Sequence, residues 1–202
     1  MTLTEIDTQL FLLINAAQNT PKLAVTCAIF CAQYLIYLPI FISFFYWFKY
    51  PKSRETITKI VVIVITTLLV TAILRSLISS SRPFDLAIGT NFLPHSNTNS
   101  FPSKHASVIF AITFALFYAT KNQIKQKKFF IGSLLIAILI SWARVYLGVH
   151  WPLDILAAIL ISFICAYFIS VFWLKIKTIS LFLALKSHII ILAITNKRKI
   201  TK

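Results

Sequence analysis

Long apolar runs without charged residues alternate with short polar segments along most of the chain. A bilayer core of about 30 Å requires about 20 mostly apolar residues per helix. The runs at 24–48 and 155–174 reach that length, and three shorter runs, each of which continues past one end into polar residues, lie at 60–74, 106–120 and 129–143. The pattern therefore predicts about five transmembrane helices.

The segments at the two ends of the chain are less suited to spanning a bilayer. Residues 3–17 place Glu5, Asp7 and Gln9 among leucines, which predicts an N-terminal interfacial helix. Residues 178–195 carry Lys186 near their middle, and burying that charge would cost about 2.5–3.5 kcal/mol. We therefore expect a C-terminal amphipathic helix on the membrane surface, within a basic tail at 178–202. The predicted fold is an all-α polytopic membrane helix bundle, a single domain over residues 1–202 with its core at about 24–174.

The composition excludes several classes of protein. Hydrophobic residues make up 58% of the chain and charged residues 12%, whereas soluble domains have about 45–50% and about 25%. The three glycines (Gly89, Gly132, Gly148) are too far apart in sequence to form a phosphate-binding loop or a dinucleotide turn. The three cysteines fit neither a disulfide framework nor a zinc spacing, and we expect them to pack as apolar side chains; they are Cys27, Cys31 and Cys165.

The net charge of +15 is a topology signal rather than a sign of nucleic-acid binding. No basic stretch is interleaved with stacking aromatic residues in a polar setting, so no nucleic-acid partner is expected. With five spans, 15 of the 20 Lys and Arg residues fall on one side of the membrane. Basic residues collect in short cytoplasmic loops, so this side is predicted to be cytoplasmic and the N-terminus to face outward. Attraction to anionic lipid headgroups is a secondary effect.

Three polar segments should meet on the outward side. Arg75 and Arg82 are seven residues apart, which predicts that both project from one helix face before Pro83 ends the helix. Two guanidiniums at one place favour a multiply charged oxyanion. The alternative is that both are arginines near a helix end whose guanidinium groups extend to the water at the membrane surface.

The second and third segments supply histidines. Ser103 precedes an apolar run as an expected N-cap, and the amides of that helix start can bind an anion within reach of His105. His150 and Asp154 are four residues apart, so on one helix face the carboxylate could hold one ring nitrogen and leave the other basic. Both arrangements could instead be structural. A metal site is not expected, because the surrounding cations would repel a metal ion.

Together these segments resemble the three-part signature of the type 2 phosphatidic acid phosphatase superfamily. The matching motifs are Arg75-x6-Arg82-Pro83, Pro102-Ser103-x-His105 and Arg144-x5-His150-x3-Asp154. The chain departs from the usual signature at three places, with Arg75 for Lys, Lys104 for Gly and Ala143 for Ser. Arg75 keeps the charge, whereas Lys104 adds a cation beside the expected phosphate.

The resemblance implies a phosphatase that needs no metal or other cofactor. His150 would attack phosphorus, Asp154 would orient and stabilise its imidazolium, and His105 would protonate the leaving oxygen and then activate water. The phosphate would be held by Arg75, Arg82, Ser103, Lys104 and Arg144.

Within the superfamily, the chain is most similar to bacterial undecaprenyl-diphosphate phosphatases of the bacitracin-resistance type. The stretch 93–103, Arg82-Pro83-Phe84 and the overall length carry this likeness. It implies a lipid phosphate substrate, a polyprenyl diphosphate, in the bacterial inner membrane, with the site facing the periplasm or cell exterior. Lipid A phosphate or phosphatidylglycerol phosphate is an alternative substrate, with a headgroup pocket in the loop 84–101. A non-enzymatic lipid or anion transporter is a further alternative, but repeats or broken helices would be expected for it, and the sequence indicates neither.

Overall fold

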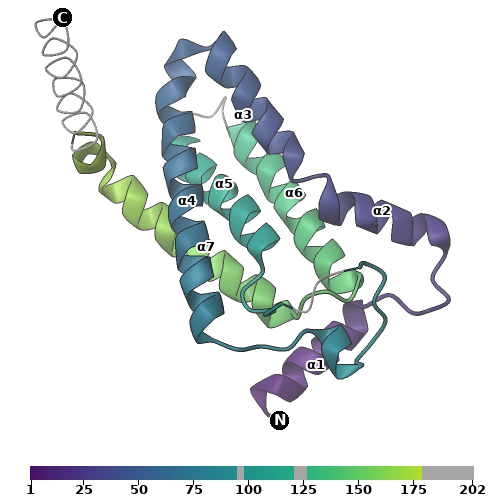
Figure 1. The fold of residues 1–202 in the computed structure, drawn as a ribbon. Helices are drawn as coiled ribbons and strands as arrows, with labels where there is room; N and C mark the ends of the chain where they lie inside the picture. The colour runs from purple at the N-terminus through teal and green to yellow at the C-terminus, as the bar shows by residue number, and fades with distance from the viewer. Residues whose placement is uncertain (95–97, 121–126, 179–202) are drawn as a thin grey trace, which may run out of the picture.

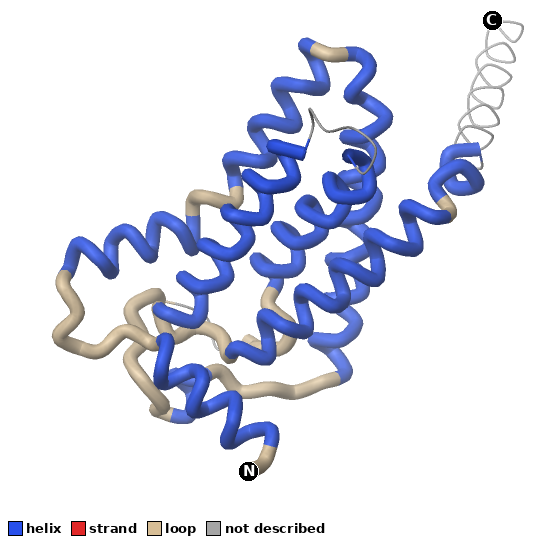
Figure 2. The backbone as a smooth tube through the Cα atoms, turned by 180° about the vertical axis from the view of Figure 1, so that it is seen from behind, coloured by secondary structure: helices blue, strands red, loops and turns tan. Residues whose placement is uncertain are grey.

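The computed structural model describes residues 1–94, 98–120 and 127–178, and no strand occurs in them (Figures 1 and 2). The predicted all-α fold is confirmed. In chain order the elements are α1 (Leu3–Ile14), α2 (Lys22–Gln33), α3 (Tyr37–Lys49), the 3-10 turn η1 (Pro51–Ser53), α4 (Arg54–Leu77), the 3-10 turn η2 (Pro83–Leu86), α5 (Lys104–Thr120), α6 (Lys127–Tyr146) and α7 (Pro152–Val171). The segment 178–195 lies almost entirely outside the described residues.

Three of the described helical segments are long and apolar enough to cross a membrane: Pro51–Leu77, Lys127–Tyr146 and Pro152–Val171. The pair α2 and α3 makes a fourth if it is counted as one span, and α5 is a shorter apolar helix of 17 residues. The protein is therefore a multi-pass membrane protein, and the number of five spans stays a prediction.

Helix α5 lies at the centre of the bundle and packs against α4, α6 and α7 (Figure 1). Small residues let its neighbours approach closely, since the side chains of Ala106, Ala111 and Ala115 are buried. Buried hydroxyls also join the helices. Oγ1 of Thr71 on α4 donates to Ser107 on α5 (3.1 Å), and Oγ of Ser162 on α7 donates to the Ser107 carbonyl (2.9 Å). Thr113 on α5 pairs with Ser133 on α6 (2.7 Å).

The run 24–48 is not one straight helix as expected. It is divided into α2 and α3, which are bent by 41° at residues 34–36. Pro39 accounts for the break, because it has no N–H for the carbonyl of Leu35 and its ring would clash with that carbonyl in a continuous helix. The Leu35 carbonyl instead accepts from Leu38 N at 3.2 Å. The expectation that the chain has no broken helix is therefore wrong.

The N-terminal helix α1 is docked across the same end of the bundle as the loops that precede α5 and α7 (Figures 1 and 2). Phe11 is fully buried and its ring lies 5.1 Å from that of Trp151. Asn15 donates to the carbonyls of Thr90 (2.9 Å) and Tyr146 (3.1 Å), which ties α1 to the loop before α5 and to the end of α6. The predicted N-terminal helix therefore forms, and it is an integral part of this end of the protein.

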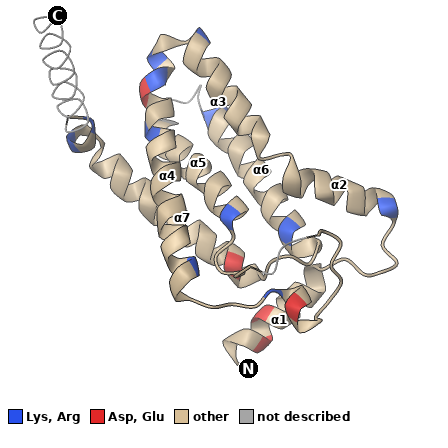
Figure 3. Cartoon of the chain, viewed as in Figure 1, with Lys and Arg blue, Asp and Glu red and all other residues tan. Residues whose placement is uncertain are grey.

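Charged residues are concentrated towards the two ends of the bundle, and the middle of the helices is largely free of them (Figure 3). One end holds the α3–α4 connection and the start of α6, with Lys49, Lys52, Arg54, Lys59, Lys127 and Lys128. The opposite end holds the three motifs. The helix arrangement therefore separates the basic loops from the site, as the charge pattern predicted.

Candidate active site

Arg82 lies in the connection between α4 and α5 rather than on α4, which ends at Leu77. The prediction that Arg75 and Arg82 share one helix face is therefore wrong. Two local features end the helix early. The three serines at 79–81 can bond their own backbone in non-helical conformations, and Pro83 favours an extended conformation for Arg82, whose φ and ψ are −79° and 160°.

The two arginines nevertheless converge on the same stretch of loop. Arg75 donates from Nη1 to the carbonyls of Ser100 (3.1 Å) and Pro102 (2.9 Å), and from Nη2 to that of Asn99. Arg82 also donates to the Asn99 carbonyl, from Nη2 at 3.4 Å. The loop before α5 is thus held between two guanidiniums.

Arg82 is the link between this loop and His150. The Arg82 side chain is almost fully buried; its Nη1 donates to the Val149 carbonyl (2.7 Å) and lies 3.5 Å from Nε2 of His150. Burial lowers the pKa of Arg82 and the nearby Arg75 lowers it further, whereas Asp154 raises it. An anion close to these two arginines, one of which lies beside the His150 imidazole, would be stabilised because it relieves their mutual repulsion.

His150 and Asp154 form the predicted pair, with 3.0 Å between Nδ1 and Oδ2, and both are about 2% exposed or less. The expectation that they share a helix face is wrong, because α7 begins at Pro152 and His150 precedes it. Asp154 instead folds back over the start of α7, where Oδ2 also accepts from Trp151 N (2.9 Å) and from the hydroxyl of Ser100. Because Asp154 accepts from Nδ1, Nε2 presents its lone pair towards Arg82.

Ser103 immediately precedes α5 as predicted, and its carbonyl accepts from Ser107 N at 2.9 Å. Its hydroxyl is buried but does not form the expected cap, since Oγ has no hydrogen-bond partner among the described residues. The Ser103 amide donates to the Asp154 carbonyl (3.3 Å), so the start of α5 is fixed against the turn that carries Asp154.

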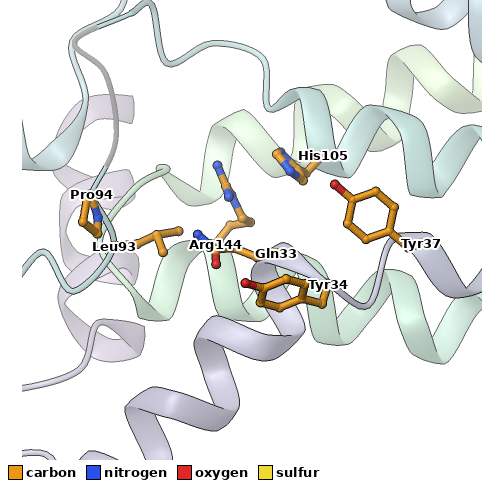
Figure 4. A pocket seen from close by; sticks show the side chains of 7 residues that line it. All are labelled: Gln33, Tyr34, Tyr37, Leu93, Pro94, His105 and Arg144. Carbon is orange, nitrogen blue, oxygen red and sulfur yellow. The ribbon is translucent and has the colours of Figure 1, made fainter.

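His105 and Arg144 face a cavity of about 360 Å³ (Figure 4). Its remaining lining comes from the α2–α3 break and from the loop before α5: Gln33, Tyr34, Tyr37, Leu93 and Pro94. His150 and Asp154 do not line this cavity. They are connected to it through Val149, whose amide donates to the Arg144 carbonyl (3.1 Å) and whose own carbonyl binds Arg82.

Lys104, which was predicted as a site residue, does not line the cavity. It is the first residue of α5, and its side chain is exposed. In the described part of the chain, no group of three or more His, Cys, Asp or Glu side chains is placed to hold a metal ion. The arrangement thus combines an oriented imidazole, a second imidazole and several arginines.

Two groups of residues at the site were missed by the sequence reasoning. Ser100 belongs to the polar run 95–100, and nothing in its sequence distinguishes it from the serines and asparagines around it. Gln33, Tyr34 and Tyr37 lie within a predicted span, and Pro39 was the signal that this span is broken near them.

Comparisons with known proteins show the family to which the chain belongs. The pattern of the PAP2 superfamily matches residues 56–177, which is more than half of the chain. The chain belongs to the PAP2 superfamily. "Putative undecaprenyl-diphosphatase YbjG" of Escherichia coli (strain K12) is 36% identical over 174 residues, covering 85% of this chain and 84% of that protein. "Bacitracin transport permease protein BcrC" of Bacillus licheniformis is 29% identical over 175 residues, which cover 86% of this chain and 82% of that protein.

A solved structure shares the fold. The crystal structure of Aquifex aeolicus LpxE has a TM-score of 0.67 and 25% sequence identity, and the match covers 85% of this chain and 99% of that one. The superfamily predicted from the three motifs and the similarity to undecaprenyl-diphosphatases are confirmed. The protein is a membrane lipid phosphatase.

Proposed function

We propose that the protein hydrolyses undecaprenyl diphosphate to undecaprenyl phosphate and inorganic phosphate. The support for this substrate is the relative that is 36% identical over most of both chains and is named an undecaprenyl-diphosphatase. A cavity lined by His105 and Arg144 offers a proton donor and a cation together, as a phosphate leaving group requires.

The single observation that carries the mechanism is the environment of His150. Its Nδ1 is held by Asp154 at 3.0 Å, and its Nε2 lies 3.5 Å from an Arg82 nitrogen. Nε2 is therefore the proposed nucleophile. It forms a bond to the terminal phosphorus while the bond to the bridging oxygen breaks, and Asp154 stabilises the imidazolium that results.

His105 completes the proton transfers in this proposal. It donates a proton to the leaving oxygen, which departs on undecaprenyl phosphate. It then takes a proton from the water that attacks the phosphohistidine, so that free phosphate leaves and His150 returns to its starting state. The proposed phosphate-binding groups are Arg75, Arg82, Ser103, Lys104 and Arg144. Charge stabilisation by such groups provides much of the rate enhancement in phosphoryl transfer.

We place the site at the outer face of the bacterial cytoplasmic membrane. The support is the distribution of basic residues, because most of the described Lys residues lie at the end of the bundle opposite the site. A site on that face would meet undecaprenyl diphosphate in the outer leaflet.

The decisive experiment follows phosphate release by the purified protein in detergent. The substrates are undecaprenyl diphosphate, phosphatidic acid and phosphatidylglycerol phosphate, and we expect the diphosphate to be preferred. His150→Ala and His105→Ala should each abolish release while the protein still inserts into membranes, and His188→Ala serves as the matched control outside the motifs. Wild-type protein mixed with diphosphate labelled in its terminal phosphate and quenched in base should carry label on His150.

Near-normal turnover by either of the first two variants would refute the assigned roles. Preference for one of the other two lipids would refute the substrate.

A further inference from the structure

The α2–α3 break forms a wall of the cavity that faces His105 and Arg144. Gln33 ends α2, Tyr34 lies in the break and Tyr37 begins α3, and all three line the cavity. Figure 4 shows the hydroxyl end of Tyr37 directed towards His105, with Gln33 and Tyr34 beside Arg144. These residues lie outside the part of the chain that matches the superfamily, residues 56–177. The wall is therefore formed by a part of the chain that the superfamily pattern does not cover.

This wall is polar, whereas the part of the lining that comes from the loop before α5 is apolar. Leu93 and Pro94 contribute no side-chain hydrogen-bonding groups, whereas the wall contributes two phenolic hydroxyls and one amide. Tyr34 and Tyr37 are 56% and 52% exposed, so their rings are not fixed in a core. Neutral donors opposite an arginine suit an anionic group that is already partly neutralised.

The proposed role of His105 decides which part of a substrate would meet this wall. His105 protonates the leaving oxygen, so the group next to it is the leaving group and not the phosphoryl group that is transferred. In a prenyl diphosphate that leaving group is a phosphate, whereas in a lipid monophosphate it is an alcohol. At about 30 Å³ per water molecule, the cavity holds on the order of ten waters, which is ample room for a phosphate and the first part of a prenyl chain.

We propose that the α2–α3 break determines the preference for diphosphates. The Tyr37 and Tyr34 hydroxyls and the Gln33 amide donate hydrogen bonds to the leaving-group phosphate, with Arg144 supplying the charge. The inference rests on the proposed function, since it uses His105 as the proton donor. It adds a specificity element at the break to the catalytic groups already described.

Farnesyl diphosphate and farnesyl monophosphate provide the matched substrates, since they share one chain and differ in the leaving group. Tyr37→Phe and Tyr34→Phe keep the rings and remove only the hydroxyls. For each we expect kcat/KM for the diphosphate to fall about tenfold, as is typical of a lost hydrogen bond to a charged group. The monophosphate should change less than about twofold, because its leaving group carries no phosphate. Tyr118→Phe, at the far end of α5, is the matched control.

Two results would overturn the inference. Equal losses on both substrates would mean that the hydroxyls act on the general machinery. No loss in the Phe variants together with a loss in Tyr37→Ala would mean that the rings bind the chain and the hydroxyls do not bind phosphate. A Tm measured in detergent for each variant separates these results from unfolding. Failure of the wild-type protein to release phosphate from either farnesyl substrate would instead refute the proposed function, and the inference with it.

Discussion

Asp7 connects the N-terminal helix to the turn that carries His150 and Asp154. Its carboxylate accepts from Leu153 N at 3.0 Å, within the first turn of α7, and its side chain is buried with 8% exposure. Asp7→Ala would leave this amide without its acceptor and would loosen the turn next to Asp154. We therefore expect lower turnover and lower stability from a change in a segment that lies outside the superfamily match.

The size of the effect follows from the hydrogen bond that is lost. Replacing a side-chain acceptor at a helix N-terminus by Ala costs about 1 kcal/mol, within a range of about 0.5–2. In a chain of this length, 1 kcal/mol corresponds to a fall in Tm of about 2–4 °C. Asp7→Asn keeps an oxygen at the same place, so it should recover most of the loss.

The pH dependence gives an independent test. Burial raises the pKa of Asp7 above its ordinary value, so the folded protein holds this proton more tightly than the unfolded chain does. That contribution to stability is complete below the ordinary pKa and is lost as the pH rises through the raised pKa. Asn does not titrate, so the Tm of Asp7→Asn relative to wild type should rise across this window.

The assay combines Tm in detergent with kcat for phosphate release, and Thr8→Ala on the same helix is the control. Among the described residues, the Thr8 side chain donates a hydrogen bond within α1, to the Thr4 carbonyl. If Asp7→Ala and Asp7→Asn had the same Tm and the same kcat, the side-chain oxygen at position 7 would not support the first turn of α7, and the reasoning would be wrong.

Three further predictions concern the chemistry and the sidedness. Activity should survive EDTA, because arginines supply the charge that a metal ion provides elsewhere; loss on chelation that a divalent ion restores would contradict this. In a Cys-free background, Asn91→Cys should react with an impermeant thiol reagent in intact cells and Lys52→Cys should not, and the reverse pattern would invert the topology. Lys104→Gly should lower turnover of undecaprenyl diphosphate more than that of phosphatidic acid, by about tenfold if the ammonium contributes about 1.4 kcal/mol to the transition state; equal effects would remove the role of Lys104.

The apolar runs and the three motifs were sufficient to predict the helical fold, the superfamily and the pairing of His150 with Asp154. Spacing alone failed where a helix ends. Arg75 and Arg82 are two helical turns apart only if the helix continues through residues 79–81, and it does not. Their meeting point is the loop before α5, where both reach the Asn99 carbonyl. Contacts of this kind depend on the path of a loop, which hydrophobic periodicity does not encode.

The cavity wall could not be predicted for a different reason. Gln33, Tyr34 and Tyr37 belong to a run with the composition of an ordinary span, and only the tertiary position of the break places them in the cavity lining. Asp7 is similar, since acidic residues in a short helix, here Glu5 and Asp7, are typical of a solvated face. Its burial results from the docking of α1 on the ends of α6 and α7.

The buried hydroxyls between the helices affect how the protein inserts into the membrane and assembles. Thr113 donates to the Ile109 carbonyl (2.8 Å) within its own helix. The hydroxyl proton of Ser162 has the Ala158 carbonyl (2.6 Å) as an acceptor within its own helix, as an alternative to the Ser107 carbonyl. Such hydroxyls are satisfied before any neighbour arrives, so each helix can enter the bilayer alone and find its partners afterwards. The proposed catalytic groups come from segments that meet only once α4, α5, α6 and α7 have associated. A newly inserted chain is therefore a set of inert helices, and its ability to hydrolyse lipids begins with their lateral assembly.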